Sequence, residues 1–555
     1  MRKTLIIMAF AVFYLASLLY QGCDNSARNN TNKQAEQAQS DCPNITKPFP
    51  GYDGKYSPPE WWCQENKVNE KEYPIFQIKT DYPDNYNEYI EPNYCSEKDC
   101  SWKKYNFKSK EDQDNYMKEV IKYAFDGNLE VDWVVQKNTK ERKWFHAPFM
   151  HLDIVVPSSL DPDDPQCKTN QKNDKCEPIL EEKVSREFMH GLTMERPGCL
   201  SELNYTVNNP PCAFPPSDPE KNFQSWAVSF YNERGASYIR EVWNEVLHPK
   251  AAKPDPQNFP SKGFPDGAVA IKLLFTHAPP DKVEYLKDSV VWKADTGDFI
   301  REGGMNKAKR LKEKDLSKED CDKDRSQCVT ELRLLQIDIA VRDERENETD
   351  RSPTGWVFAT FTYHKDAEPF IKYESSQKID DGWLRIKPLG LIFGNDPHAK
   401  KGDEIKESIL NTELGIPQHY GCGDDENPFK RRLNGPVDNP ASSCISCHSQ
   451  SETPKDLKIG SVPYGCMRCE SEYNIAEWFR NINPRSAILK EQTFTASTAN
   501  KPMFSLDYSL QLREGIRRFC VESYISGVNK CELNYNQGDD FTVITKQGTK
   551  TYTIQ

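Results

Sequence analysis

The chain has 555 residues, and its 85 acidic side chains outnumber its 73 Lys and Arg side chains, giving a net charge of −12. This acidic balance argues against a nucleic-acid partner, because phosphate binding favours a basic surface. The length leaves room for two to four domains of about 100–200 residues each. The 18 cysteines are typical of an exported protein in an oxidising compartment.

The N-terminus predicts export. Met1-Arg2-Lys3 precedes an apolar run that ends near Leu19, which is the pattern of a signal peptide over residues 1–22. The run is short for a membrane span, which needs about 20 apolar residues. Gly22-Cys23 resembles a bacterial lipoprotein cleavage site, which implies that Cys23 is lipidated and tethers the chain to the periplasmic side of a membrane. The alternative is ordinary signal cleavage, with Cys23 in a disulfide.

Two segments follow the signal peptide. Residues 23–60 are rich in Asn, Gln, Ser, Pro and Gly and predict a flexible tether. Residues 61–143 predict a mixture of helix and loop. Within them Tyr116, Val120 and Ala124 recur every four residues, which predicts one amphipathic helix.

Residues 144–420 predict a β-rich domain, because apolar residues there recur with a period of two. Asn232-Glu233-Arg234-Gly235 is turn material, and we expect residues 236–243 to return as the second strand of a hairpin. The predicted strands are Trp226–Phe230, Ala268–Thr276, Leu332–Val341, Thr354–Tyr363 and Trp383–Phe393. The expected fold class is α+β, with a large, mostly antiparallel β domain of sandwich or barrel type.

Residues 421–535 predict a small helical region after the β domain. We expect helices at Ile475–Ile482 and Asp507–Phe519 from their apolar spacing. Residues 536–555 predict a terminal hairpin with Gln547-Gly548 at its turn.

The most specific motif is Cys444-Ile445-Ser446-Cys447-His448. Its C-x-x-C-H spacing attaches a c-type haem, with thioethers from Cys444 and Cys447 and with His448 as an axial ligand of the iron. The sequence therefore predicts one covalent haem c. The alternatives are a Cys444–Cys447 disulfide beside an unrelated histidine, or half of a zinc site.

The sixth position of the iron has one candidate ligand, Met503, in Pro502-Met503-Phe504. The order of C-x-x-C-H, middle helix, Met loop and closing helix resembles the class I cytochromes c. That resemblance implies Met503 as the second axial ligand and electron transfer as the function. The alternative is that Met503 packs in the core.

The β domain resembles a second family. Phe264-Pro265-Asp266-Gly267-Ala268 precedes Lys272, and Gly355-Trp356 with Phe358 precedes the single late C-x-x-C-H motif. This arrangement resembles the lysine-crosslinked, hydroxylamine-oxidising c-type cytochromes and their nitric-oxide-binding β-sheet relatives. The resemblance implies that Lys272 bonds the porphyrin edge, that His448 is the proximal ligand and that the iron keeps an open distal site. From its strand alone, Lys272 is equally a solvated lysine or a partner of Asp338.

Several stretches resemble an uncharacterised family of exported bacterial cytochrome c proteins, which implies no particular reaction. They lie at residues 144–148, 186–192, 226–232 and 388–396. His146, His151 and His190 stand near aromatic residues, where they are core residues or members of a metal or acid–base pocket. Proximity in sequence suggests the disulfides Cys95–Cys100, Cys167–Cys176, Cys199–Cys212, Cys321–Cys328 and Cys520–Cys531, although sequence does not fix connectivity.

Three functions remain open from the sequence. The first is a lipid-anchored monohaem cytochrome c in periplasmic electron transfer, with an unidentified redox protein as its partner. The second is a haem-dependent oxidoreductase or sensor for hydroxylamine, nitric oxide or peroxide. The third is a binding lipoprotein without haem.

Overall fold

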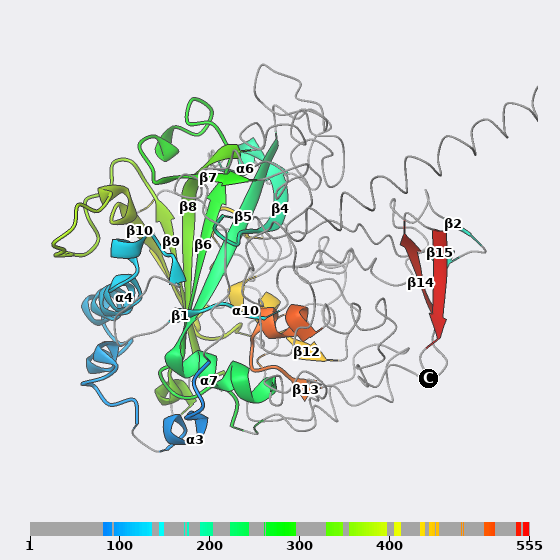
Figure 1. The fold of residues 1–555 in the computed structure, drawn as a ribbon. Coiled ribbons are helices and arrows are strands. Elements are labelled where there is room, and N and C mark those ends of the chain that lie inside the picture. Colours follow the sequence, from blue (N-terminus) through cyan, green and yellow to red (C-terminus); the bar gives the residue numbers. More distant parts are fainter. Residues whose placement is uncertain are drawn as a thin grey trace, which may run out of the picture.

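A large antiparallel sheet of nine strands dominates the structure, a computed structural model, so the protein is mostly β (Figure 1). Residues 1–81, and with them Cys23, lie outside the part of the chain that the structure describes, as does Met503. The described residues are 82–91, 94–135, 144–148, 171–172, 175–176, 189–203, 222–243, 260, 262–295, 329–347, 354–396, 405–411, 414, 433, 435–438, 443–449, 451–453, 479, 481, 504–516, 540–545 and 548–553.

The strands of the main sheet follow the order β1-β5-β6-β8-β9-β10-β11, with β4 paired to β5 and β7 paired to β8. The predicted antiparallel β-rich character is confirmed, and the described strands of this domain, apart from a short pair at residues 171–176, form one sheet rather than two stacked layers. Its strands are β1 (Trp144–Phe145), β4 (Thr193–Cys199), β5 (Asn222–Asn232), β6 (Val269–Thr276), β7 (Val291–Asp295), β8 (Val329–Arg342), β9 (Trp356–Tyr363), β10 (Ile386–Ile392) and β11 (Ser408–Leu410).

Three two-stranded pairs lie outside the main sheet. They join β2 (Gln171–Lys172) to β3 (Lys175–Cys176), β12 (Glu452–Thr453) to β13 (Phe504–Ser505), and β14 (Asp540–Thr545) to β15 (Gly548–Thr553). The last pair confirms the predicted terminal hairpin, whose strands run antiparallel. Of the predicted helix at Ile475–Ile482, residues 475–478, 480 and 482 lie outside the described residues.

Helices cover both faces of the sheet. The longest helix among the described residues is α4 (Lys110–Phe125), which is the helix predicted around Tyr116, Val120 and Ala124, and all three are buried. The others are α3 (Tyr86–Tyr89), α6 (Leu200–Leu203), α7 (Glu233–Val242) and α10 (Cys444–His448), with 3₁₀ turns at Ser101–Lys104, Leu129–Val131, Glu284–Leu286, Glu344–Asn347 and Asp381–Trp383. Residues 510–516 are also helical, inside the predicted Asp507–Phe519 helix. Of the helices in these residues, none has the length and the apolar character that crossing a membrane requires.

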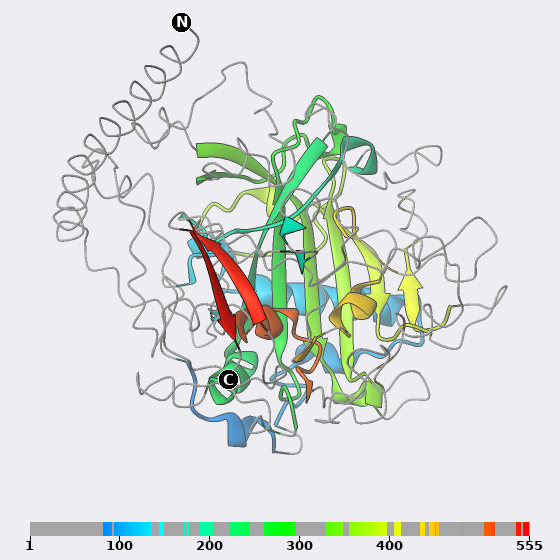
Figure 2. The same ribbon diagram turned by 90° about the vertical axis from the view of Figure 1, so that its right-hand side faces the viewer.

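The two faces of the sheet build two cores. Strand side chains that point to one face of the sheet, such as those of Ile271, Ile337 and Ile339, pack with α4 in the larger core. The other face packs with α7, α10 and the helix at residues 510–516. Both views show α4 on one side of the sheet and α10 with the 510–516 helix on the other (Figures 1 and 2). The region around the C-x-x-C-H motif therefore shares a core with the sheet, and a separate cytochrome-like helical part is not shown.

The hairpin predicted at residues 236–243 is wrong, because this segment is helix α7. Asn232 ends β5 with an extended backbone, and its side-chain oxygen accepts a hydrogen bond from the amide of Gly235 at 3.0 Å. That contact is a helix N-cap, which satisfies an amide that has no partner inside the helix. The buried residues Ala236, Ile239 and Val242 are also three apart, so the segment had the spacing of one helical face.

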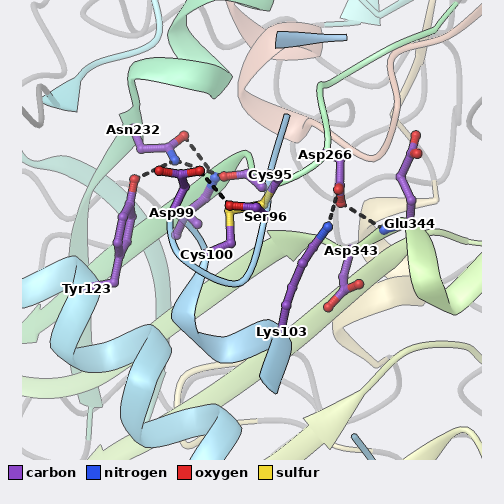
Figure 3. The surroundings of a disulfide bond; sticks show 12 residues. Cys95, Ser96, Asp99, Cys100, Lys103, Tyr123, Asn232, Asp266, Asp343 and Glu344 are labelled. Atoms are coloured by element: carbon purple, nitrogen blue, oxygen red, sulfur yellow. Dashed lines mark hydrogen bonds and ion pairs between the residues drawn. A yellow bond between two sulfur atoms is a disulfide. The ribbon is translucent and has the colours of Figure 1, made fainter. Parts of the chain in front are cut away.

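The side chain of Asn232 makes hydrogen bonds beyond the cap of α7. Its side chain also accepts from the amide of Val269 at 3.0 Å and donates to the carbonyl of Gly267 at 2.9 Å and to the hydroxyl of Tyr123 at 3.0 Å (Figure 3). Asn232→Ala should lower the free energy of unfolding by about 3 kcal/mol, because it removes a helix cap and leaves a buried strand amide without a partner. Denaturant unfolding followed by circular dichroism measures the change.

The matched control is Ser109→Ala, which removes the N-cap of α4. Ser109 accepts one hydrogen bond, from the amide of Asp112 at 3.1 Å, at an exposed position. Its replacement should cost about 1 kcal/mol, the ordinary value of an N-cap. Equal decreases in the free energy of unfolding of the two variants would show that the buried contacts of Asn232 add no stability beyond that of a helix cap.

One predicted disulfide is confirmed. Cys95 and Cys100 are bonded beside the loop that leads into β6 (Figure 3). A Cβ atom at Gly267 would lie 2.4 Å from the sulfur of Cys95, so this loop needs glycine there. Cys199 is also disulfide-bonded, and Cys212, its predicted partner, lies outside the described residues.

Candidate functional site

The C-x-x-C-H motif forms the one-turn helix α10 (Figure 2). Ser443 caps it: its hydroxyl accepts from the amide of Ser446 at 3.1 Å, and the Ser446 hydroxyl accepts from the amide of Ser443 at 2.6 Å. The Ser443 hydroxyl also donates to the side-chain oxygen of Asn395 at 2.7 Å, which ties the helix to the chain beyond β10. This reciprocal capping fixes the start of the helix.

The helix places the three functional side chains together. Positions i, i+3 and i+4 share a face of a helix, so Cys444, Cys447 and His448 lie on one side. Ile445 is fully buried on the other. Both cysteines of the motif are thiols rather than a disulfide. The arrangement is the one that thioether attachment requires.

His448 is oriented by its neighbours. Its Nδ1 lies 2.7 Å from the carbonyl oxygen of Tyr508, so Nδ1 carries the proton and Nε2 keeps its lone pair. The ring packs against Phe358 with centroids 4.7 Å apart. Burial lowers the pKa of His448 to about 4. A neutral imidazole with a fixed tautomer is the form that ligates iron.

A polar band crosses the sheet on the face that α10 covers. Lys272 of β6 lies opposite Asp338 of β8, and Asp338 lies opposite Thr360 of β9. The Thr360 hydroxyl is 3.9 Å from the sulfur of Cys444, so the band reaches the motif. The flanking Ile271 and Ile337 belong to the core on the opposite face, as the alternation along a strand requires.

Lys272 lies close to the motif, but its ion-pair partner is not the one considered from sequence. Its ammonium is 2.9 Å from the carboxylate of Glu195 on β4. Burial alone would lower the pKa of Lys272, but the carboxylates of Glu195 and Asp338 outweigh it and raise the pKa. The lysine is therefore a cation, and its charge adds to burial in lowering the pKa of His448.

Gln336 and Asp438 complete the band. The Gln336 amide nitrogen donates to Asp338 at 2.8 Å and to Asp438 at 3.1 Å. A Cβ atom at Gly435 would lie 2.1 Å from the Gln336 amide, so glycine there gives the amide its room. Burial and the charge of Asp438 raise the pKa of Asp338 to about 7.

Several side chains between α10 and the sheet stay partly exposed. Ala270 and Ala340 face each other across β6 and β8, in the middle of the sheet, yet both stay partly exposed. Lys272, Cys444 and His448 are also partly exposed, although burial is the largest influence on the pKa of each. Solvent therefore reaches part of each of these side chains. Two thiols that can form thioethers and a neutral imidazole that can ligate iron are the groups that haem c attachment uses.

Some predicted site residues are not brought together. Met503 lies outside the described residues, but Phe504, the next residue, pairs with Thr453 just after the motif. His146 contacts the carbonyl of Ser229 and His190 stacks on Trp292, while His151 is outside the described part. Within that part, no three His, Cys, Asp or Glu side chains are grouped to hold a metal ion.

Sequence reasoning missed Gln336, Asp438, Glu195 and Tyr508. Gln336 and Asp338 did carry a signal, because they are polar residues two apart in an otherwise apolar strand, on the same face as Lys272. Asp438 carried none, because it is 102 residues from Gln336 in the chain. Comparison with known protein families, curated proteins and solved structures finds no match to this chain.

Proposed function

We propose that the chain attaches one haem c through Cys444 and Cys447, with His448 as the axial ligand. In this proposal it binds a small nitrogen or oxygen species, such as hydroxylamine, nitric oxide or peroxide, on the polar side of the site. The observation that carries the proposal is the position of Lys272 and Asp338, which lie on the sheet face that α10 covers, with Thr360 linking the band to Cys444. The protein would be a haem-dependent oxidoreductase or a sensor.

The chemistry of the band supports ligand binding over simple electron transfer. The polarity and the hydrogen-bond donors around a haem decide between ligand activation and electron transfer. Lys272 supplies a cation that attracts an anionic or polarised ligand. Asp338, with a pKa near 7, supplies a proton at neutral pH. Haem c would supply the redox chemistry, and Tyr508 would keep His448 in the ligating tautomer.

The second candidate is a periplasmic electron carrier in which Met503 is the sixth ligand. The pairing of Phe504 with Thr453 favours it, as does the hydrogen bond from the Leu506 amide to the Ser451 carbonyl at 2.8 Å. Both contacts bring the chain that follows Met503 back beside the motif. In this reading the helical region acts like a class I cytochrome c, and the sheet docks a redox partner protein.

The location belongs to the proposal as well. Lipidation of Cys23 would anchor the protein to a membrane in the cell envelope, on the periplasmic side. That compartment is oxidising, which agrees with the disulfide at Cys95 and Cys100 and with the chemistry of haem attachment. A binding lipoprotein without haem is the third reading.

Absorption spectra of the full chain, produced with a haem-maturation system, separate the two haem candidates. The proposal predicts a high-spin oxidised spectrum, because one coordination position of the iron stays open. It also predicts that Met503→Ala leaves the spectrum unchanged.

A low-spin spectrum with a sulfur-to-iron band that Met503→Ala removes would establish the electron carrier instead. If acid–acetone extraction removed all colour from the protein, both haem candidates would be wrong. The matched control is Met117→Ala, since Met117 is buried on α4 beyond the opposite face of the sheet.

A further inference from the structure

We propose that Asp338 and Asp438, bridged by the amide of Gln336, form a carboxyl pair that holds one proton and exchanges it with the ligand bound beside α10. This inference rests on the proposed function for its ligand step. The pair itself is a property of the chain alone, so the two can be tested separately.

The geometry of the pair is fixed by one buried amide. Gln336 is fully buried, and its nitrogen donates to Asp338 at 2.8 Å and to Asp438 at 3.1 Å. Its oxygen accepts from the amide of Val437 at 3.3 Å. Asp438 also accepts from the amide of Gly435 at 2.6 Å. Two carboxyl groups are thus held at hydrogen-bonding distance from the same nitrogen.

The charges around the pair favour a single proton. Lys272 of β6 is the cation whose charge acts on Asp338, and it is already paired with Glu195 at 2.9 Å. Its remaining attraction lowers the pKa of Asp338, but burial and the charge of Asp438 raise it more. Two like charges in a desolvated site disfavour each other, so one proton remains on the pair to a higher pH than on an ordinary aspartate.

The groups that face the pair come from every neighbouring element. Besides Lys272, β9 contributes Thr360, which hydrogen-bonds to Asp338. Helix α10 contributes Cys444, whose pKa is raised by burial and then by the charges of Asp438 and Asp338. Cys444 would carry no titrating thiol once it is bonded to haem. Its place beside both carboxyl groups puts the pair next to the attachment point.

The step itself moves one proton and no electrons. The O–H bond of the carboxylic acid breaks, and the proton bonds to a nitrogen or oxygen atom of the ligand. The pair then carries two negative charges, with Lys272 nearby, until water returns the proton. Such a pair would act as the acid of the site at neutral pH and as its base above that pH.

Infrared spectroscopy of the full chain without haem tests the pair directly. The C=O stretch of a protonated carboxyl group should persist at pH values where ordinary aspartates are ionised, and it should disappear with a midpoint near 7. Asp438→Asn should move that midpoint down, because it removes the like charge that raises the pKa of Asp338, while burial should keep the midpoint above the ordinary aspartate range. Asp338→Asn should remove the absorption at neutral pH. Asp366→Asn, which removes an exposed carboxylate, is the control and should leave the infrared absorption of the protonated carboxyl group unchanged.

Nitrite binding to the oxidised haem protein tests the ligand step. Ionisation of the pair adds one negative charge beside the site, so nitrite affinity should fall about tenfold across the midpoint, and Asp338→Asn should remove this dependence. If the wild-type chain shows no infrared absorption of a protonated carboxyl group near pH 7, the proposed carboxyl pair is wrong, even if haem is attached. A chain that shows this infrared absorption but attaches no haem would overturn the proposed function and, with it, the ligand step.

Discussion

Replacing both Cys444 and Cys447 with alanine should abolish covalent haem attachment completely and leave the sheet folded. The two thiols are the only groups through which the proposal binds the porphyrin covalently at α10. Their side chains lie on one side of the helix, while Ile445 on the other side and the Ser443–Ser446 capping contacts hold the helix in place. Haem staining after denaturing electrophoresis measures attachment, and circular dichroism measures the fold.

The two single variants test the contribution of each thiol to haem attachment. Cys444→Ala and Cys447→Ala each leave one thiol, so each should retain a haem bound by one thioether. The control is Cys95→Ala with Cys100→Ala, which removes a disulfide far from α10 in sequence and should leave haem staining at the wild-type level. Undiminished staining in the double variant of the motif would show that haem is bound elsewhere.

Replacing Lys272 with methionine should lower the reduction potential of the haem protein. A cation near the iron favours the reduced form, which carries one positive charge fewer. At a separation on the order of 8 Å and an effective dielectric constant of about 20, one charge contributes about 2 kcal/mol, or roughly 90 mV for one electron. Potentiometric titration followed by absorption measures the shift.

Glu195 provides the matched opposite change. Its carboxylate offsets the charge of Lys272 at 2.9 Å, so Glu195→Gln should raise the potential. Lys293→Met, on the exposed side of β7, should leave the potential within measurement error. If Lys272 bonds the porphyrin edge, as the resemblance to the lysine-crosslinked cytochromes implies, Lys272→Met should also move a red-shifted spectrum back to that of an ordinary haem c. A potential that does not respond to either Lys272 or Glu195 would place the haem away from the polar band.

The parts of the site that depend on local pattern could be predicted from the sequence. The period of two along β6 put Lys272 on the face opposite Ile271, and the structure has it there. The C-x-x-C-H spacing singled out Cys444, Cys447 and His448, which the structure places on one short helix. The helix α4 followed from residues four apart.

The parts that depend on long-range contacts could not be predicted. No local signal joins Tyr508 to His448, because the two are 60 residues apart in the chain. The same is true of Glu195 and Lys272, which are 77 residues apart. The prediction for residues 236–243 was wrong for a different reason. Their apolar residues fit both the period of a strand and that of a helix, and the Asn232 cap, with its tertiary contacts to Val269 and Gly267, selects the helix.

Mass spectrometry of proteolytic peptides from the full chain, produced with haem maturation, tests the central claim most directly. The account predicts that the peptide containing Cys444 and Cys447 is heavier by the mass of one haem. A haem that also joins this peptide to the one containing Lys272 would place the lysine at the porphyrin edge. A peptide of unmodified mass, or one in which Cys444 and Cys447 have lost two hydrogens to form a disulfide, would contradict the account.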